Sequence, residues 1–273
     1  MKQYVNICVM TAVAAAMISC ENMKSDGVEF RTVTINDMYK LDVEVGNNPL
    51  GYEITTDMMF LQAKDENRKD VCEKINKSII SEFLTQDVCE TPEEAIRKYI
   101  DEKIESYKLD VADVYKEEIL KNKGSDDGYS YASFNHNTHL KGVASRGFDG
   151  IINYSLTEDS YSGGAHPVSY TTMMCFSVDN GERVHLEDVF CEGSDKKLVE
   201  LLTDELMKAK KVDSVDKLKD MGFLAFTEMF VPDNFSLGPD SVTFFYNQYD
   251  IAPYSEGTTS LSLSYKDMKG LLR

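Results

Sequence analysis

The chain has 273 residues, of which 42% are hydrophobic and 10% aromatic, and its formal net charge at pH 7 is −18. This composition is typical of a folded globular protein and excludes a disordered chain, and the length suits a body of two closely packed parts. Because 47 acidic residues outnumber 29 basic ones, the surface repels phosphate groups. We therefore expect no nucleic acid as a partner and an electrostatic preference for basic molecules, unless the acidic surface serves solubility alone.

Residues 1–20 have the pattern of an export signal. An early lysine is followed by a mostly apolar run at 9–18, which is too short to span a bilayer. Cys20 and a polar stretch follow, as at the cleavage site of bacterial lipoproteins, although Met17 and Ile18 stand where that pattern prefers leucine and a small residue. We expect a lipid on Cys20 to anchor the chain to the bacterial cell envelope, in the outer membrane by preference. The alternative is an ordinary signal peptide with an incidental cysteine.

Residues 21–29 are polar and are expected to form a tether.

An exported chain reaches an oxidising compartment, where the remaining cysteines, Cys72, Cys89, Cys175 and Cys191, allow either one of three disulfide pairings or free thiols. Cys72 and Cys89 flank one predicted helix and would lie about 25 Å apart, which is too far for a disulfide. No cysteine or histidine spacing is typical of zinc, and we predict neither a metal nor a cofactor.

Residues 30–125 are predicted to form an N-terminal α+β subdomain. Apolar residues alternate in its first part, which is typical of strands, and then recur every four residues, which is typical of amphipathic helices. Thr91 to Glu94 form a capping box with proline at the first helical position, a helix start signal. The expected elements are a strand at 30–45 with a break at Asn36 and Asp37, a turn at 47–51, a strand at 52–63, and helices at 69–86, from 92 through Tyr107, and at 110–120.

Residues 126–273 are predicted to form a C-terminal α+β domain. Asn180-Gly181 between two β-type runs is a strong hairpin signal. Ser194 is the expected N-cap of a helix whose apolar face carries leucines at spacing four. The other expected strands lie near 129–131, around Val143, at 152–156, 170–178, 183–186, 242–246 and 261–265. The whole chain is therefore predicted to be α+β, with an antiparallel or mixed sheet, helices packed on one side, and two intimately associated subdomains.

Two stretches stand out from the regular elements. The first, residues 161–167, joins an aromatic residue to a double glycine, a histidine and a proline, a combination that makes a sharp, rigid bend. The second, residues 249–257, is a connector dense in aromatic residues with a proline and a glycine. The candidate binding residues are Tyr161, Gly163, Gly164, His166, Tyr249, Pro253 and Tyr254.

Together, in this order and about 90 residues apart, these two stretches resemble the extracytoplasmic domain of lysozyme-sensing anti-sigma factors, which is also found ahead of the catalytic domain of a peptidoglycan deacetylase. The resemblance covers roughly residues 145–270, and residues 30–125 resemble the smaller domain that precedes it. It implies a mixed sheet packed by helices and a non-catalytic role, which in the anti-sigma factors is direct binding of lysozyme. The chain has no transmembrane helix, cytoplasmic segment or deacetylase domain, so we expect the outer domain alone on a lipid anchor.

The leading hypothesis is therefore an envelope-anchored binding lipoprotein that recognises a basic protein such as lysozyme, or a cell-wall glycan such as peptidoglycan. Tyrosines at 161, 249 and 254 are the kind of side chain that anchors interfaces, although core packing would equally account for them. For the glycines and Pro253 a structural role is the favoured interpretation, and a direct role in binding is the alternative.

Two other functions remain open. A cell-wall hydrolase would use His166 as general base or metal ligand, and a general base would have Asp159, Glu158 or Glu256 as its partner. A structural accessory subunit of an envelope complex is the third hypothesis. His136 and His139 have a spacing that suits a metal only on a helix, whereas their context indicates a strand or loop.

Overall fold

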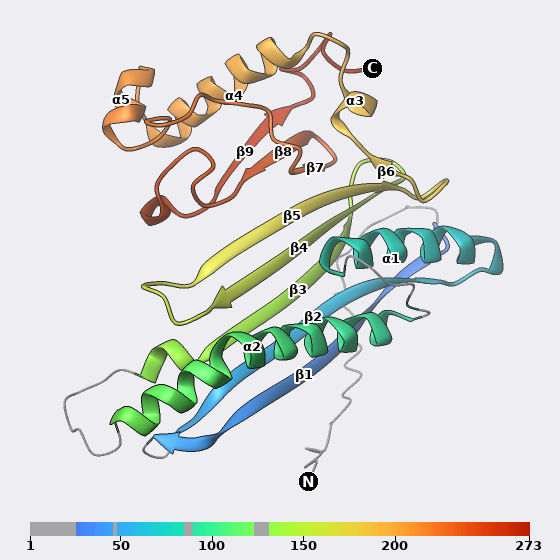
Figure 1. Ribbon diagram of the computed structural model, residues 1–273. Coiled ribbons are helices and arrows are strands. Elements are labelled where there is room, and N and C mark those ends of the chain that lie inside the picture. Colours follow the sequence, from blue (N-terminus) through green and yellow to red (C-terminus); the bar gives the residue numbers. More distant parts are fainter. Residues whose placement is uncertain (1–25, 46–47, 85–88, 90, 123–130) are drawn as a thin grey trace.

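Two β-sheets and their helices make up the protein (Figure 1), whose computed structural model describes residues 26–45, 48–84, 89, 91–122 and 131–273. The predicted export signal at residues 1–20, including Cys20, lies outside the described residues. The strands are β1 (Val28–Val45), β2 (Asn48–Ala63), β3 (His136–Arg146), β4 (Ile151–Tyr161), β5 (Val168–Ser177), β6 (Arg183–Val184), β7 (Phe235–Leu237), β8 (Ser241–Tyr246) and β9 (Thr259–Ser264). The helices are α1 (Lys69–Phe83), α2 (Pro92–Asn122), α3 (Leu186–Val189), α4 (Asp195–Lys210) and α5 (Val215–Asp220), with short 3₁₀ turns η1 (Glu66–Arg68), η2 (Tyr131–Phe134) and η3 (Tyr254–Glu256).

The larger sheet has six strands in the order β1-β2-β3-β4-β5-β6. Its neighbouring strands are antiparallel except for β2 and β3, which run parallel, with Tyr52 opposite His136 and Met58 opposite Gly142. A parallel pair needs a crossover connection, and here α1 and α2 supply it. Both helices lie on the same face of the sheet (Figure 1). The prediction of an α+β fold with a mixed sheet and helices on one side is confirmed.

Helix α2 begins where the sequence predicts. The Thr91 hydroxyl accepts a hydrogen bond from the Glu94 N–H at 3.2 Å, and the Glu94 carboxylate accepts one from the Thr91 N–H at 3.3 Å, which completes the capping box. The separate helix predicted at 110–120 is wrong, because α2 continues unbroken to Asn122. The buried side chains of Tyr107, Val111 and Tyr115 extend its apolar face, and neither glycine nor proline interrupts it.

Strand β1 begins inside the stretch predicted to be a tether. Val28 is buried and belongs to the core beneath the sheet. Asp26 forms an ion pair with Arg146 on β3, with Oδ2 at 2.9 Å from Nε. β1 is one strand with a register shift between Lys40 and Glu44, rather than two runs separated at residues 36–37. The six-stranded sheet takes strands from both sides of residue 125, and the domain boundary predicted there stays a prediction.

The smaller sheet has three antiparallel strands in the order β7-β8-β9. Helix α4 covers it, and its buried leucines Leu198, Leu202 and Leu206 fulfil the predicted apolar face. Ser194 stands at the N-cap position as predicted, although its side chain makes no capping hydrogen bond. These elements enclose a second hydrophobic core, distinct from the one between the larger sheet and α1 and α2.

The buried side chain of Asn153 joins the two sheets. From β4, its Nδ2 donates to the Leu237 carbonyl on β7 at 3.0 Å, and its Oδ1 accepts from the Leu237 N–H at 2.9 Å. The Cys175 thiol donates to the same Oδ1 at 3.2 Å. The amide thus pairs with β7 as a neighbouring strand would, and both its oxygen and its nitrogen have protein partners.

Amide side chains also close the outer edge of β5, where β6 pairs only with Cys175 and Phe176. Asn247 and Asn234 both donate from Nδ2 to the Thr171 carbonyl, at 3.0 and 2.9 Å. The backbone N–H groups of this edge donate to side chains as follows: Ser169 to Gln248 at 3.4 Å, Thr171 to Asn247 at 2.7 Å and Met173 to Asn234 at 3.0 Å. The edge therefore has hydrogen-bond partners although no long strand lies beside it.

Several short elements differ from expectation. The stretch near residue 131 forms η2 rather than a strand, and α3, α5 and β7 were not predicted. The hairpin at Gly181 is confirmed, with that glycine at φ +71° between β5 and β6. Among the described residues, no helix combines the length and the apolar character needed to cross a membrane.

Candidate functional site: an aromatic surface between two loops

The first predicted stretch forms the exposed loop between β4 and β5. Gly163 has φ +82°, and a Cβ atom there would lie 2.4 Å from the Ser133 Cα. Only glycine fits this position, because the loop packs directly against the backbone of η2. Gly164 has open space around it. The backbone packing therefore requires glycine at 163 but not at 164.

The second stretch forms the connection from β8 to β9. Pro253 precedes η3, and its ring lies close to Gly222, where a Cβ atom would be 3.2 Å from the proline Cδ. The Asp250 carboxylate accepts a hydrogen bond from the Asn247 N–H at 2.7 Å. The connection from β8 to β9 is thus held by the hydrogen bond between Asp250 and Asn247 and by the packing of Pro253 on Gly222, which follows α5. These contacts fix the backbone that carries Tyr249 and Tyr254.

The two stretches meet in space. The His166 ring stacks on the Tyr254 ring, with 3.8 Å between ring centroids and 20° between ring planes. The Tyr254 hydroxyl donates to the Pro167 carbonyl at 2.9 Å. The Tyr249 ring lies 5.9 Å from that of Tyr254, tilted by 34°. In Figure 1 these two loops lie at the same end of the molecule, at its left side. We call His166, Tyr249 and Tyr254 the aromatic surface.

Tyr249 is, like His166, an exposed member of the aromatic surface, and it is conformationally strained. Its side chain is 60% exposed, and its φ is +71°. A bulky residue with positive φ is a genuine outlier, and such strain costs about 1–3 kcal/mol. Tyr249 gains little burial in return for this strain.

Tyr161 is separate from this cluster. It ends β4, is partly buried, and pairs with Asn137 on β3. Among the ring contacts of the described residues, none joins Tyr161 to the aromatic surface. The structure therefore brings together three of the predicted aromatic residues and leaves the fourth at the edge of the sheet.

The carboxylates predicted as partners of His166 have other contacts. Glu158 accepts hydrogen bonds from the helix α2, and Glu256 forms an ion pair with Lys210 at 3.3 Å. Asp159 stands opposite His139 in the sheet. His166 Nδ1 lies 3.1 Å from the Pro167 carbonyl oxygen. A catalytic role for His166 stays a prediction, and its observed contacts orient the loop.

His136 and His139 lie on strand β3, as their sequence context indicated. Side chains three apart on a strand point to opposite faces. The His136 ring contacts Tyr107 at 4.9 Å between centroids, and its burial lowers its pKa below the ordinary value. His139 Nε2 lies 3.4 Å from an Asp57 carboxylate oxygen. No cluster of three metal-binding side chains occurs in the described part of the chain.

The four cysteines in the described residues are free thiols. Cys72 and Cys175 are buried, Cys89 is partly buried and Cys191 is exposed. Burial raises the pKa of Cys175 to about 12 and also raises that of Cys72. Both buried cysteines are therefore protonated and unreactive at neutral pH.

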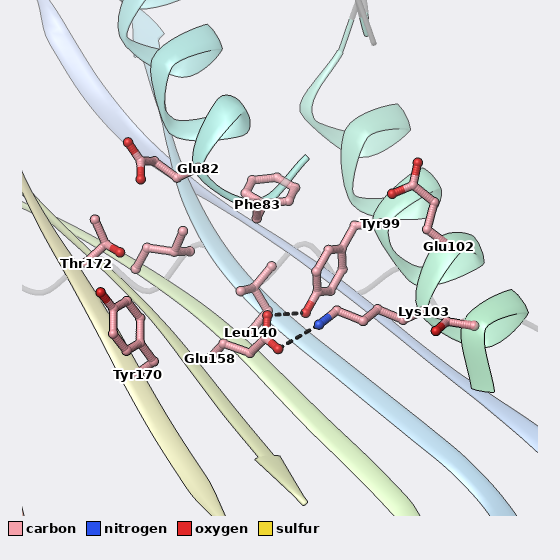
Figure 2. Close-up of a pocket in the computed structure, with 11 residues that line it drawn as sticks. Glu82, Phe83, Tyr99, Glu102, Lys103, Leu140, Glu158, Tyr170 and Thr172 are labelled. Atoms are coloured by element: carbon pink, nitrogen blue, oxygen red, sulfur yellow. Dashed lines mark hydrogen bonds and ion pairs between the residues drawn. The ribbon is translucent and has the colours of Figure 1, made fainter. Parts of the chain in front are cut away.

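A second feature, a groove beside α2, was missed by the sequence reasoning (Figure 2). Its centre is Glu158, which accepts hydrogen bonds from the Tyr99 hydroxyl at 2.8 Å and from Lys103 at 2.7 Å. The signal was present, because Glu158 continues the helix-facing register of Ile152, Tyr154 and Leu156 on β4. A carboxylate at a core-facing position needs buried partners, and only the fold shows that α2 provides them.

The fold and the aromatic surface define an α+β protein with two sheets, which displays a small exposed aromatic cluster. Residues 187–266 match the family described as "Protein of unknown function (DUF3298)". The match runs from α3 to just beyond β9 and includes Tyr249, Pro253 and Tyr254, but not the loop at 161–167. No curated protein matches the chain.

Two solved structures have a similar fold. One is a member of the DUF3298 family from Bacteroides fragilis, with 23% identity, a TM-score of 0.81, and coverage of 92% of this chain and 96% of that one. The other is a DUF3298 family protein from Pseudomonas aeruginosa PAO1, with 16% identity, a TM-score of 0.59, and coverage of 90% and 94%. The likeness extends over nearly the whole chain. It is a likeness of fold, and the relation to lysozyme-sensing anti-sigma factors stays a prediction.

Proposed function

We propose that this chain is a non-catalytic binding protein, anchored to the bacterial envelope by a lipid on Cys20, which captures a basic protein of the lysozyme type. The observation that carries the proposal is the aromatic surface, where residues about 90 positions apart meet and Tyr249 is held outward in a strained conformation. Tyrosines are enriched among the residues that dominate binding energy in protein interfaces. Stored strain at an exposed side chain is characteristic of a functional position.

The net charge supports a basic partner. At −18, the protein attracts cationic proteins and accelerates their encounter, more strongly at low salt. The aromatic surface would then supply the short-range contact after the encounter. The contacts of Gly163, Pro253 and the Tyr254 hydroxyl support this role, since they hold the two loops in a fixed arrangement before a ligand arrives.

Binding of lysozyme to the full-length protein, measured by calorimetric titration at low and moderate salt, tests this proposal. We expect saturable binding that weakens as salt is raised. Tyr249→Asn should weaken binding about tenfold or more, because it removes the exposed ring. Asparagine tolerates positive φ, so the thermal midpoint should be unchanged or higher.

The matched control is Leu109→Ala, which removes a 79% exposed apolar side chain from α2 rather than from the aromatic surface. This variant should bind as the wild type does. Absence of binding at both salt concentrations would remove lysozyme as the ligand. Equal binding by the wild type and Tyr249→Asn would show that the aromatic surface is not the contact.

The lipid anchor has a separate test. Cells fed radiolabelled palmitate should incorporate label into the mature wild-type protein, and Cys20→Ala should abolish it, because the thioether and amide attachment both require that cysteine. Cell fractionation should then place the wild type in the membrane fraction. Label that persists in Cys20→Ala would contradict the proposed anchor.

A further inference from the structure

The groove in Figure 2 lies between α1, α2 and the exposed parts of β4 and β5. Its volume is about 320 Å³, which is at the lower end of the range for pockets that bind small ligands. Leu140 and Leu156 form its buried floor. The rings of Phe83, Tyr99 and Tyr170 line it from α1, α2 and β5 respectively. It thus offers apolar and aromatic surface on three sides.

Charged groups occupy the centre of the groove. Lys103 bonds one oxygen of Glu158, the Tyr99 hydroxyl bonds the other, and the Lys103 ammonium also lies 5.2 Å from the centre of the Tyr99 ring. Burial, together with the adjacent Glu158 carboxylate, raises the pKa of Tyr99 far above its ordinary value, so its hydroxyl stays protonated and donates. These bonds fix the three side chains in one arrangement.

The same groups retain hydrogen-bonding capacity for a ligand. A carboxylate accepts about four hydrogen bonds and an ammonium donates three. The bond between Glu158 and Lys103 and the bond from Tyr99 to Glu158 use only part of this capacity. Tyr170 and Thr172, each of which carries a hydroxyl, also line the groove. Donors and acceptors therefore stand beside aromatic ring faces within one small space.

We propose that this groove binds a short saccharide of one to three rings. A pyranose ring has a face of C–H groups, which packs on aromatic rings, and a rim of hydroxyls, each of which both donates and accepts. The groove provides tyrosine rings for the face and the Glu158–Lys103 pair for the rim. Charged donors and acceptors make the strongest hydrogen bonds to neutral hydroxyls.

Other classes of ligand fit the groove less well. A cationic side chain would meet the Lys103 ammonium, which already forms an ion pair with Glu158. Glu82, which is paired with Arg183, and Glu102 also line the groove, so a cationic probe is the competing ligand in the test. A wholly apolar ligand would take the Glu158–Lys103 pair out of water without replacing its hydrogen bonds to solvent. The saccharide site goes beyond the proposed capture of a protein, and it uses different residues from the aromatic surface.

Calorimetric titration of the full-length protein with cellotriose, maltotriose and chitotriose tests the inference, with lysine amide as the cationic probe. We expect at least one trisaccharide to bind with Kd of about 1 mM or tighter. Tyr170→Ala should raise Kd about tenfold or more by removing an aromatic wall, and Glu158→Gln should do so by removing the charged acceptor. Since Tyr170 is 59% exposed, its replacement leaves the fold intact.

Tyr249→Asn is the matched control, because it removes a tyrosine of similar exposure outside the groove; its saccharide affinity should equal that of the wild type. The inference is overturned if no trisaccharide binds, if Tyr170→Ala and Glu158→Gln bind as the wild type does, or if only lysine amide binds. Lysozyme affinity in Tyr170→Ala should be unchanged, so failure of this inference and failure of the protein-binding proposal are distinguishable.

Discussion

Asn153→Ala should lower the free energy of unfolding by about 2–4 kcal/mol, because it removes three buried hydrogen bonds and leaves a cavity. The Leu237 carbonyl keeps a second bond, from the Phe148 N–H at 2.9 Å. The Leu237 N–H loses its Asn153 acceptor at a site where Leu237 is 6% exposed. An unpaired buried donor accounts for about 1–3 kcal/mol of the expected loss.

Urea unfolding followed by circular dichroism measures this effect, and a lower midpoint with an unchanged slope would identify a loss of stability in the native protein. The control is Asn137→Ala, an exposed asparagine on the neighbouring strand β3, which should change stability by no more than about 0.5 kcal/mol. Equal stability of the two variants would show that the Asn153 amide does not fasten β7 to β4.

The second large effect is expected at Gly142, where β3 passes the buried Tyr154 ring. A Cβ atom on Gly142 would lie 1.9 Å from the Tyr154 hydroxyl oxygen and 2.9 Å from the Met58 sulfur. Tyr154 is fully buried, so it has nowhere to move. Gly142→Ala should therefore lower the free energy of unfolding by about 3 kcal/mol through overpacking.

Tyr154→Phe should have the opposite sign. Its hydroxyl is buried and has no hydrogen-bond partner among the described residues, so removing it relieves a desolvation penalty and should stabilise the protein by about 1 kcal/mol. The double variant Gly142→Ala/Tyr154→Phe lacks the Tyr154 hydroxyl oxygen, which is the atom nearest to the added Cβ. The ring carbon at 2.8 Å from that Cβ remains. A double-mutant cycle by thermal unfolding should show favourable coupling of about 1 kcal/mol. Strict additivity would contradict the proposed clash.

Local signals in the sequence predicted the elements that local interactions determine. The capping box at Thr91 acts within four residues, and the hairpin at Gly181 depends on the backbone of a single turn. The apolar spacing of Leu198, Leu202 and Leu206 indicates one helical face whatever lies against it. These features need no knowledge of the rest of the chain, and the structure contains all of them.

Features that depend on distant partners were not predictable in the same way. The length of α2 was underestimated because residues 110–120 were assigned to a separate helix, whereas the helix continues across the sheet to Asn122. β7 has only three residues and takes its conformation from β8 and Asn153. The parallel pairing of β2 with β3 is set by the crossover through α1 and α2, which no periodicity records.

The candidate site shows the same division. The two unusual stretches were recognisable because glycine, proline and tyrosine were concentrated in them. The sequence did not reveal that His166 stacks on Tyr254, or that Tyr161 stands apart. Glu158 was considered as a partner of His166 because the two are close in the sequence. Strand alternation instead places the Glu158 side chain on the sheet face that α2 covers, where it bonds Tyr99 and Lys103. Residue type was therefore enough to identify candidate residues, whereas the contacts of Glu158 depend on the register of β4, which the sequence does not show.

The asparagine side chains along β5 have a consequence for how this protein meets other chains. A sheet edge with unpaired peptide groups accepts a further strand, which is the route to strand exchange and to fibrillar aggregation. At β5, Asn234, Asn247 and Gln248 occupy those groups with side chains that cannot propagate a ladder. Among the described strands, the outer strands of this sheet are β1 and β6, and β6 has only two residues. Intermolecular strand addition to the larger sheet is thereby confined to the β1 edge, and copies of the protein cannot join through the β5 edge even when they are crowded together.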